Sequence, residues 1–177
     1  MKFLIVGTGR AGKFLHANAI NSLNCEISGF VDINEDLGLM AAKEFNTKFY
    51  KSIEDGINDS NCDVVSICTG ANTHLPIARV AAKYKKPLII EKPLTNTIKE
   101  LDELALIRDE QKIGICVIHN HRFYKSYKIA RDIKNEVGEI VGIRRSMAFN
   151  HDSVRMMEPN HWSHLIPGGR LFEANPH

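Results

Sequence analysis

Short apolar runs alternate with amphipathic stretches along the first two thirds of this sequence. The first apolar run, residues 2–6, is continuous, which is typical of a strand that is buried on both faces of a sheet. The predicted strands cover residues 2–6, 26–33, 48–50, 63–68, 87–90 and 114–119. Helical spacing predicts helices over residues 12–23, 35–45, 52–58, 75–83 and 97–110. Asn34 and Thr97 are suited to cap two of these helices at their N-termini.

Strands that alternate with helices of this length form crossover units and a parallel sheet. We therefore expect residues 1–120 to fold as an α/β domain with a doubly wound parallel sheet, the Rossmann architecture. The pattern changes after residue 120, where a predicted helix over 124–135 is followed by Gly138 and a long predicted strand over 139–149. Residues 121–177 are expected to be the beginning of an α+β domain that is incomplete in this chain.

The charge balance excludes several classes of partner. The 23 basic and 21 acidic side chains give a net charge of +2, so no broad basic field is available for nucleic acid. No window approaches the roughly 18 uninterrupted apolar residues of a membrane span. The apolar run at the N-terminus is interrupted at Gly7, too early for a secretory signal peptide. We expect a cytoplasmic protein with no nucleic acid and no membrane partner.

The strongest motif follows the first predicted strand. Residues 7–12 read Gly-Thr-Gly-Arg-Ala-Gly and open the first predicted helix. In such a loop the first glycine permits a tight turn, the second lets the backbone approach a pyrophosphate, and the third lets helix and strand pack closely. Asp32, at the end of the second predicted strand, is placed to accept hydrogen bonds from a ribose diol.

These features predict a dinucleotide site. The Asp32 carboxylate repels a 2′-phosphate and residues 33–34 offer no arginine, so NAD is favoured, while Arg10 leaves NADP possible. Two further strands end in Thr-Gly-Ala-Asn-Thr-His at 69–74 and Glu-Lys-Pro at 91–93, and ligands bind at such strand ends. The predicted cofactor-binding residues are Gly7, Thr8, Gly9, Arg10, Ala11, Gly12, Asp32, Ile33, Thr69, Gly70, Asn72, His74, Glu91 and Lys92.

Taken together, these motifs resemble the glucose–fructose oxidoreductase / inositol dehydrogenase / MocA family. The Asn-His-Arg-Phe segment at 120–123 is similar to an Asn-x-Arg-Phe segment of that family. Residues 138–142 are close to its Gly-x-Ile-Gly pattern, and Pro-Gly-Gly at 167–169 followed by His177 resembles its Gly-Gly…Asp-x-x-x-His helix.

The resemblance implies an NAD(P)-dependent oxidoreductase that moves a hydride between nicotinamide and a hydroxyl carbon of a sugar, cyclitol or nucleotide sugar. It assigns the catalytic roles to Lys92, Glu173 and His177, although Glu173 stands where the family usually has aspartate. Substrate contacts are expected from Lys92, Asn120, Arg122 and Trp162. It further implies homo-oligomers when the second domain is complete.

Other interpretations stay open at this point. The alternatives are that His74 is a first-turn helical residue, Arg122 a partner of a structural carboxylate, and Trp162 a core residue. No cysteine or carboxylate stands at metal-binding spacing to the histidines, so no metal site is expected. The four cysteines are interpreted as buried free thiols. The competing function is a non-catalytic dinucleotide-binding module, because the remainder of the second domain is missing from this sequence.

Overall fold

The computed structural model describes residues 1–142. By its internal contacts the chain divides into two compact units, Met1–Ile118 and a second unit that begins at His119. Each unit is described by itself below.

The first unit is built on a six-stranded parallel sheet with the strand order β3-β2-β1-β4-β5-β6. The strands are β1 Lys2–Val6, β2 Glu26–Val31, β3 Phe49–Tyr50, β4 Val64–Ile67, β5 Leu88–Ile90 and β6 Ile115–Val117. The order reverses between β1 and β4, so this is the point at which a doubly wound sheet forms its ligand crevice. The predicted fold class is thereby confirmed.

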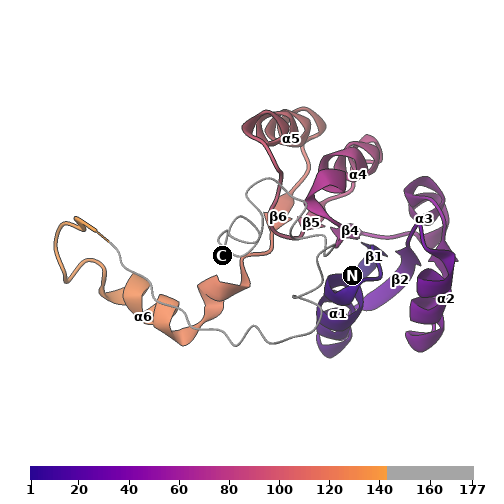
Figure 1. The fold of residues 1–177 in the computed structure, drawn as a ribbon, viewed down its shortest axis with the longest axis horizontal. Helices are drawn as coiled ribbons and strands as arrows, with labels where there is room; N and C mark the ends of the chain where they lie inside the picture. Colours follow the sequence, from indigo (N-terminus) through magenta and orange to yellow (C-terminus); the bar gives the residue numbers. More distant parts are fainter. Residues whose placement is uncertain (143–177) are drawn as a thin grey trace, which may run out of the picture. The chain divides into compact units, whose positions relative to one another are not determined.

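Helices connect successive strands and lie on both sides of the sheet (Figure 1). They are the π-helix η1 Ala11–Ala17, α1 Asn18–Ser22, α2 Glu35–Glu44, α3 Ile53–Ser60, α4 Ala71–Lys83 and α5 Ile98–Gln111. The starts of α2 and α5 follow from local side-chain chemistry. Asn34 accepts a hydrogen bond from the Leu37 N–H at 3.0 Å, and Thr97 forms a capping box with Glu100.

Two apolar clusters, one on each face of the sheet, form the core. Alternate residues of one strand serve opposite clusters: Leu4 of β1 packs with residues of α3, α4 and α5, while Ile5 packs with residues of α1 and α2. Both side chains are fully buried. This burial on both faces explains why the strands read as continuous apolar runs.

One predicted helix boundary was wrong. Pro76 suggested a helix that starts at Leu75, but α4 begins at Ala71, with Gly70 in an extended conformation at its N-cap. The Thr73 hydroxyl donates to the Gly70 carbonyl at 2.7 Å and stabilises this earlier first turn. Asn72 and His74 therefore belong to the first turn of α4 rather than to a loop.

The second unit is described as far as residue 142. It contains the short 3₁₀-helix η2 Asn120–Phe123 and the helix α6 Lys125–Ile133, which agrees in position with the predicted helix over 124–135. Residues 139–142 are not in a strand, and the rest of the strand predicted over 139–149 lies outside the described residues. In the described part of the chain, no helix combines the length and the apolar character needed to cross a membrane.

Candidate dinucleotide-binding site

The glycine loop after β1 has the backbone that its sequence predicts. Gly7 has φ +95°, a value that side-chain-bearing residues rarely adopt. A Cβ atom on Gly12 would overlap the carbonyl oxygen of Gly7, so only glycine lets the first helix start this close to β1. A Cβ atom on Gly9, by contrast, would meet nothing within 4 Å. The loop is thus tightly packed at Gly7 and Gly12 but open at Gly9. A ligand could therefore approach the backbone at Gly9.

Asp32 is bonded to the same loop. Its Oδ2 accepts hydrogen bonds from the Thr8 N–H at 2.7 Å and the Thr8 hydroxyl at 2.6 Å. Its Oδ1 accepts the Asn34 N–H at 2.8 Å, which also orients the start of α2. The carboxylate at the end of β2 is therefore held in one orientation next to the glycine loop. The neighbouring side chains of Arg10 and Ile33 are exposed.

The turn after β4 lies against the glycine loop. A Cβ atom built on Gly7 would stand 2.9 Å from Cγ2 of Thr69. The Thr73 hydroxyl lies 2.7 Å from the Thr69 hydroxyl and links the turn to the first turn of α4. Gly70 and Asn72 are exposed at this position. The carboxyl ends of β1 and β4 thus bring two of the predicted cofactor segments together.

His74 is fully buried at the base of this turn. Its Nε2 lies 3.0 Å from the Thr69 carbonyl oxygen and its Nδ1 lies 3.1 Å from the Leu94 carbonyl oxygen. Burial lowers the pKa of the His74 ring, although the two carbonyl groups oppose this effect. The ring connects the turn after β4 with the segment after β5.

The Glu-Lys-Pro segment directly follows β5. Glu91 is buried, and its Oε2 accepts the Lys92 N–H at 3.0 Å. Burial would raise the pKa of the Glu91 carboxyl, but the hydrogen bond and charge of His16 and those of Lys92 outweigh it and hold this pKa below its usual value. Glu91 is therefore an ionised carboxylate at neutral pH beside the Lys92 backbone.

Sequence reasoning missed His16. Its ring lies in η1, with Nε2 3.1 Å from Oε1 of Glu91 and Nδ1 2.7 Å from the Ser66 hydroxyl. The available signal was a histidine one helical turn after Gly12, on the side of the helix that faces the sheet.

The remaining predicted residues belong to the part of the chain after Ile118. Asn120 and Arg122 lie in η2 of the second unit, where the ring of His121 packs on Tyr124 with the ring centroids 4.7 Å apart. Trp162, Glu173 and His177 lie outside the described residues. Among residues 1–142, no group of three metal-ligating side chains converges.

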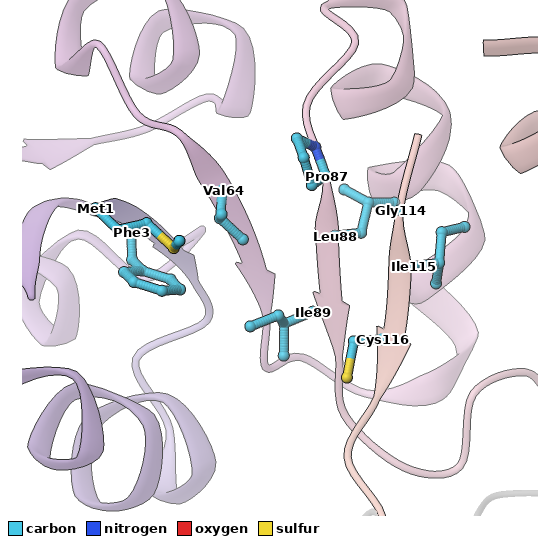
Figure 2. Close-up of a pocket in the computed structure, with 9 residues that line it drawn as sticks. All are labelled: Met1, Phe3, Val64, Pro87, Leu88, Ile89, Gly114, Ile115 and Cys116. Atoms are coloured by element: carbon cyan, nitrogen blue, oxygen red, sulfur yellow. The ribbon is translucent and has the colours of Figure 1, made fainter. Parts of the chain in front are cut away.

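An apolar hollow of about 270 Å³ lies elsewhere on the sheet. Figure 2 shows Phe3, Val64, Leu88 and Ile115 around it, at or next to the first residues of β1, β4, β5 and β6. This is the opposite end of the strands from the glycine loop. Its lining also offers almost no polar contact for a nucleotide, so the candidate site is the polar crevice rather than this hollow.

The glycine loop, the Asp32 carboxylate and the two strand-end segments are those of a dinucleotide-binding domain. The model of the Gfo/Idh/MocA oxidoreductase family, described as an NAD-binding Rossmann fold, matches residues 1–119. The chain belongs to this family. The expected cofactor, NAD, agrees with that description, and NADP stays possible.

Relatives of this family member include named sugar and cyclitol dehydrogenases. The chain is 31% identical over 132 residues to myo-inositol 2-dehydrogenase of Thermotoga maritima, covering 72% of this chain and 39% of the relative. It is 27% identical over 131 residues to UDP-N-acetylglucosamine 3-dehydrogenase of Acidithiobacillus ferrooxidans, covering 74% of this chain and 41% of that enzyme. The chain thus spans about two fifths of the length of these relatives.

Solved structures of dehydrogenases are also similar to this chain. That of the UDP-N-acetylglucosamine 3-dehydrogenase from Acidithiobacillus ferrooxidans matches with a TM-score of 0.69 and 26% identity, over 75% of this chain and 41% of the other. A probable dehydrogenase from Thermotoga maritima matches with a TM-score of 0.71 and 25% identity, over 77% of this chain and 41% of the other.

Proposed function

We propose that this chain functions in an NAD-dependent dehydrogenase that acts on a hydroxyl carbon of a sugar, cyclitol or nucleotide sugar. The observation that carries this proposal is the position of Lys92. It follows β5, and its segment is joined through His74 to the turn that packs on the glycine loop. These contacts support a proposal in which the cofactor and the proton-transferring amine of Lys92 share one end of the sheet.

The chain's own residues fit the cofactor. The amides of the glycine loop and the start of η1 receive the pyrophosphate, because Gly9 leaves the backbone accessible. The Asp32 carboxylate retains lone pairs beyond its bonds to Thr8 and Asn34, so it can accept from the ribose hydroxyls. Thr69, Asn72 and Glu91 stand nearest the nicotinamide end in this proposal, since they follow β4 and β5 on the other side of the switch point.

Lys92 is the proposed general acid–base group. The bound cofactor supplies the acceptor or donor of a hydride. The Lys92 amine hydrogen-bonds the reacting hydroxyl and accepts its proton during oxidation, or returns it during reduction. Glu173 and His177 are proposed to share this proton transfer, as the family resemblance implies. Asn120, Arg122 and Trp162 are proposed to contact the substrate.

The substrate class rests on the relatives. One is named for myo-inositol and another for UDP-N-acetylglucosamine, both polyhydroxylated rings with secondary hydroxyl groups. A single chemical operation, oxidation of a ring hydroxyl, is common to them. We therefore propose a class of substrate, polyhydroxylated rings with a secondary hydroxyl group, rather than one compound.

A second candidate is a dinucleotide-binding module without catalysis. The favouring observation is that the family model matches residues 1–119 and describes an NAD-binding fold, so this match bears on cofactor binding and not on the substrate site. In this case the crevice binds NAD and no polyol alters that binding.

The two candidates are separated by turnover. The full chain is incubated with NAD and a panel of cyclitols, aldoses and UDP-sugars, and NADH formation is followed by absorbance. Lys92→Met, which keeps the side-chain length and removes the amine, is the matched control. NADH formation that the control lacks supports the dehydrogenase. NAD binding in calorimetry without NADH formation from any member of the panel favours the binding module.

A further inference from the structure

We propose that His16 is a positioning residue for Lys92. It holds the Glu91 carboxylate, which in turn holds the Lys92 backbone, and thereby connects the helix after the glycine loop with the catalytic segment. This inference rests on the proposed function of Lys92. The contact itself is open to a test that needs no activity.

The geometry forms a continuous chain of hydrogen bonds. The Nε2 atom of His16 lies 3.1 Å from Oε1 of Glu91, while the other carboxylate oxygen, Oε2, accepts the Lys92 N–H at 3.0 Å. One carboxylate therefore bonds a side chain from η1 and the backbone of its own neighbour. Because His16 and Glu91 each have only 10% of their side chains exposed, water competes little for these bonds.

The chain of hydrogen bonds continues from His16 into the sheet. The Ser66 hydroxyl of β4 lies 2.7 Å from Nδ1 of His16, whose Nε2 faces Glu91. The Cys68 thiol lies 3.6 Å from the same hydroxyl, and burial raises the pKa of this thiol, so it stays protonated. Cys68, Ser66, His16 and Glu91 are thus linked in one continuous chain.

The helix is shaped to place His16 there. Residues Ala11–Ala17 form a π-helix, whose wider turns contain an extra residue relative to an α-helix. Such segments are uncommon and are frequent at functional sites. Gly12 and Ala17 of this segment are buried against the sheet, and His16 stands between them on the same side. The ring thus reaches Ser66 of β4 and Glu91 after β5 together.

His16 is one of two groups that keep the pKa of the Glu91 carboxyl low. The other is Lys92 of its own segment, while the Glu91 charge in turn raises the pKa values of Cys68, which follows β4, and of His74 in α4. Burial alone would raise the pKa of Glu91, and the bond to His16 is the largest effect that opposes it. Without His16, the carboxyl should take up a proton at higher pH and release the Lys92 N–H.

The first test measures the contact in the cofactor-free chain. His16→Phe removes both hydrogen bonds and keeps a ring, whereas His16→Gln retains one donor and one acceptor. We expect hydrogen exchange at the Lys92 amide to accelerate about 10-fold or more in His16→Phe and to recover in His16→Gln. Nuclear magnetic resonance of the labelled Glu91 carboxyl should give a higher pKa in His16→Phe. Unchanged exchange and an unchanged Glu91 pKa would overturn the proposal.

The second test measures positioning during turnover on a substrate from the panel above. We expect kcat of His16→Phe to fall about 10- to 100-fold, with the KM for NAD within about threefold, because the glycine loop is held separately by Asp32. The acid limb of the pH profile should move to higher pH in this variant, since Glu91 must be ionised. An unchanged kcat would overturn the proposal that His16 positions Lys92. Absence of NAD binding by the unmodified chain would instead refute the proposed function, while the exchange measurement still decides whether His16 holds Glu91.

Discussion

Replacing Gly9 with valine should abolish dinucleotide binding and leave the fold intact. The reason is that Gly9 is the glycine of the loop whose Cβ position is open in the structure, with nothing within 4 Å. A valine side chain therefore meets no protein atom at Cβ, and it occupies the space through which a pyrophosphate approaches the backbone. The same change at Gly12 would force a Cβ atom onto the Gly7 carbonyl oxygen and disrupt the loop itself.

The magnitude follows from the bonds that are lost. A hydrogen bond to a charged group contributes about 1.5–3 kcal/mol, so losing two amide–phosphate bonds weakens binding by about 3 kcal/mol or more. This corresponds to an affinity for NADH at least about 100-fold lower. Stability should change by no more than about 1 kcal/mol, because removing glycine also restricts the unfolded chain.

The assay is NADH fluorescence titration, together with thermal unfolding of the same samples. Gly114→Val is the matched control, since its Cβ position is equally open and it precedes β6, at the end of the sheet away from the crevice. The control should bind NADH within about twofold of the unmodified chain. A folded Gly9→Val variant that also binds NADH like the unmodified chain would refute the assignment of this loop.

Three further outcomes are expected. Asp32→Ala should weaken the binding of NAD by about 1–3 kcal/mol and the binding of NADP by less, as measured by calorimetry. Equal losses for the two dinucleotides would show that Asp32 does not distinguish a free ribose hydroxyl from a 2′-phosphate. Thr97→Ala should lower the free energy of unfolding by about 0.5–2 kcal/mol in urea titrations, because it removes the capping box with Glu100, and an unaffected midpoint would contradict the cap. Burial lowers the pKa of His74, so the unfolded chain binds this proton more readily than the folded one. The stability that the neutral ring contributes is complete above about pH 6.5 and is lost as the pH falls through the folded-state pKa. His74→Asn should flatten the dependence of the free energy of unfolding on pH. An unaltered slope would refute the inference that the pKa of His74 is lowered on folding.

The sequence was sufficient for the sheet because its signals are local. Continuous apolar runs mark strands such as β4, whose residues are buried on both faces. Thr97 predicted a helix start because its capping partner is only three residues away. The glycine loop was equally clear, since Gly7 has a backbone requirement, Gly12 has a packing requirement and Gly9 leaves the backbone open, all within six residues.

Features that depend on distant residues were not predictable. His16 gains its role from Ser66 and Glu91, which are 50 and 75 residues away in the sequence. The early start of α4 was missed for a local reason, because Gly70 and the Thr73 hydroxyl set the first turn ahead of Pro76. The roles of Glu173 and His177 stay predictions, because both lie outside the described residues.

The glycine loop and Asp32 are expected to hold NAD for oxidoreductase chemistry. Calorimetric titration of the full chain with NAD and, separately, with NADP measures this binding. We predict binding of one NAD per chain, tighter than NADP, because a carboxylate at the end of β2 would repel a 2′-phosphate. A chain with the circular dichroism of a folded α/β protein that releases no binding heat with either dinucleotide would contradict it.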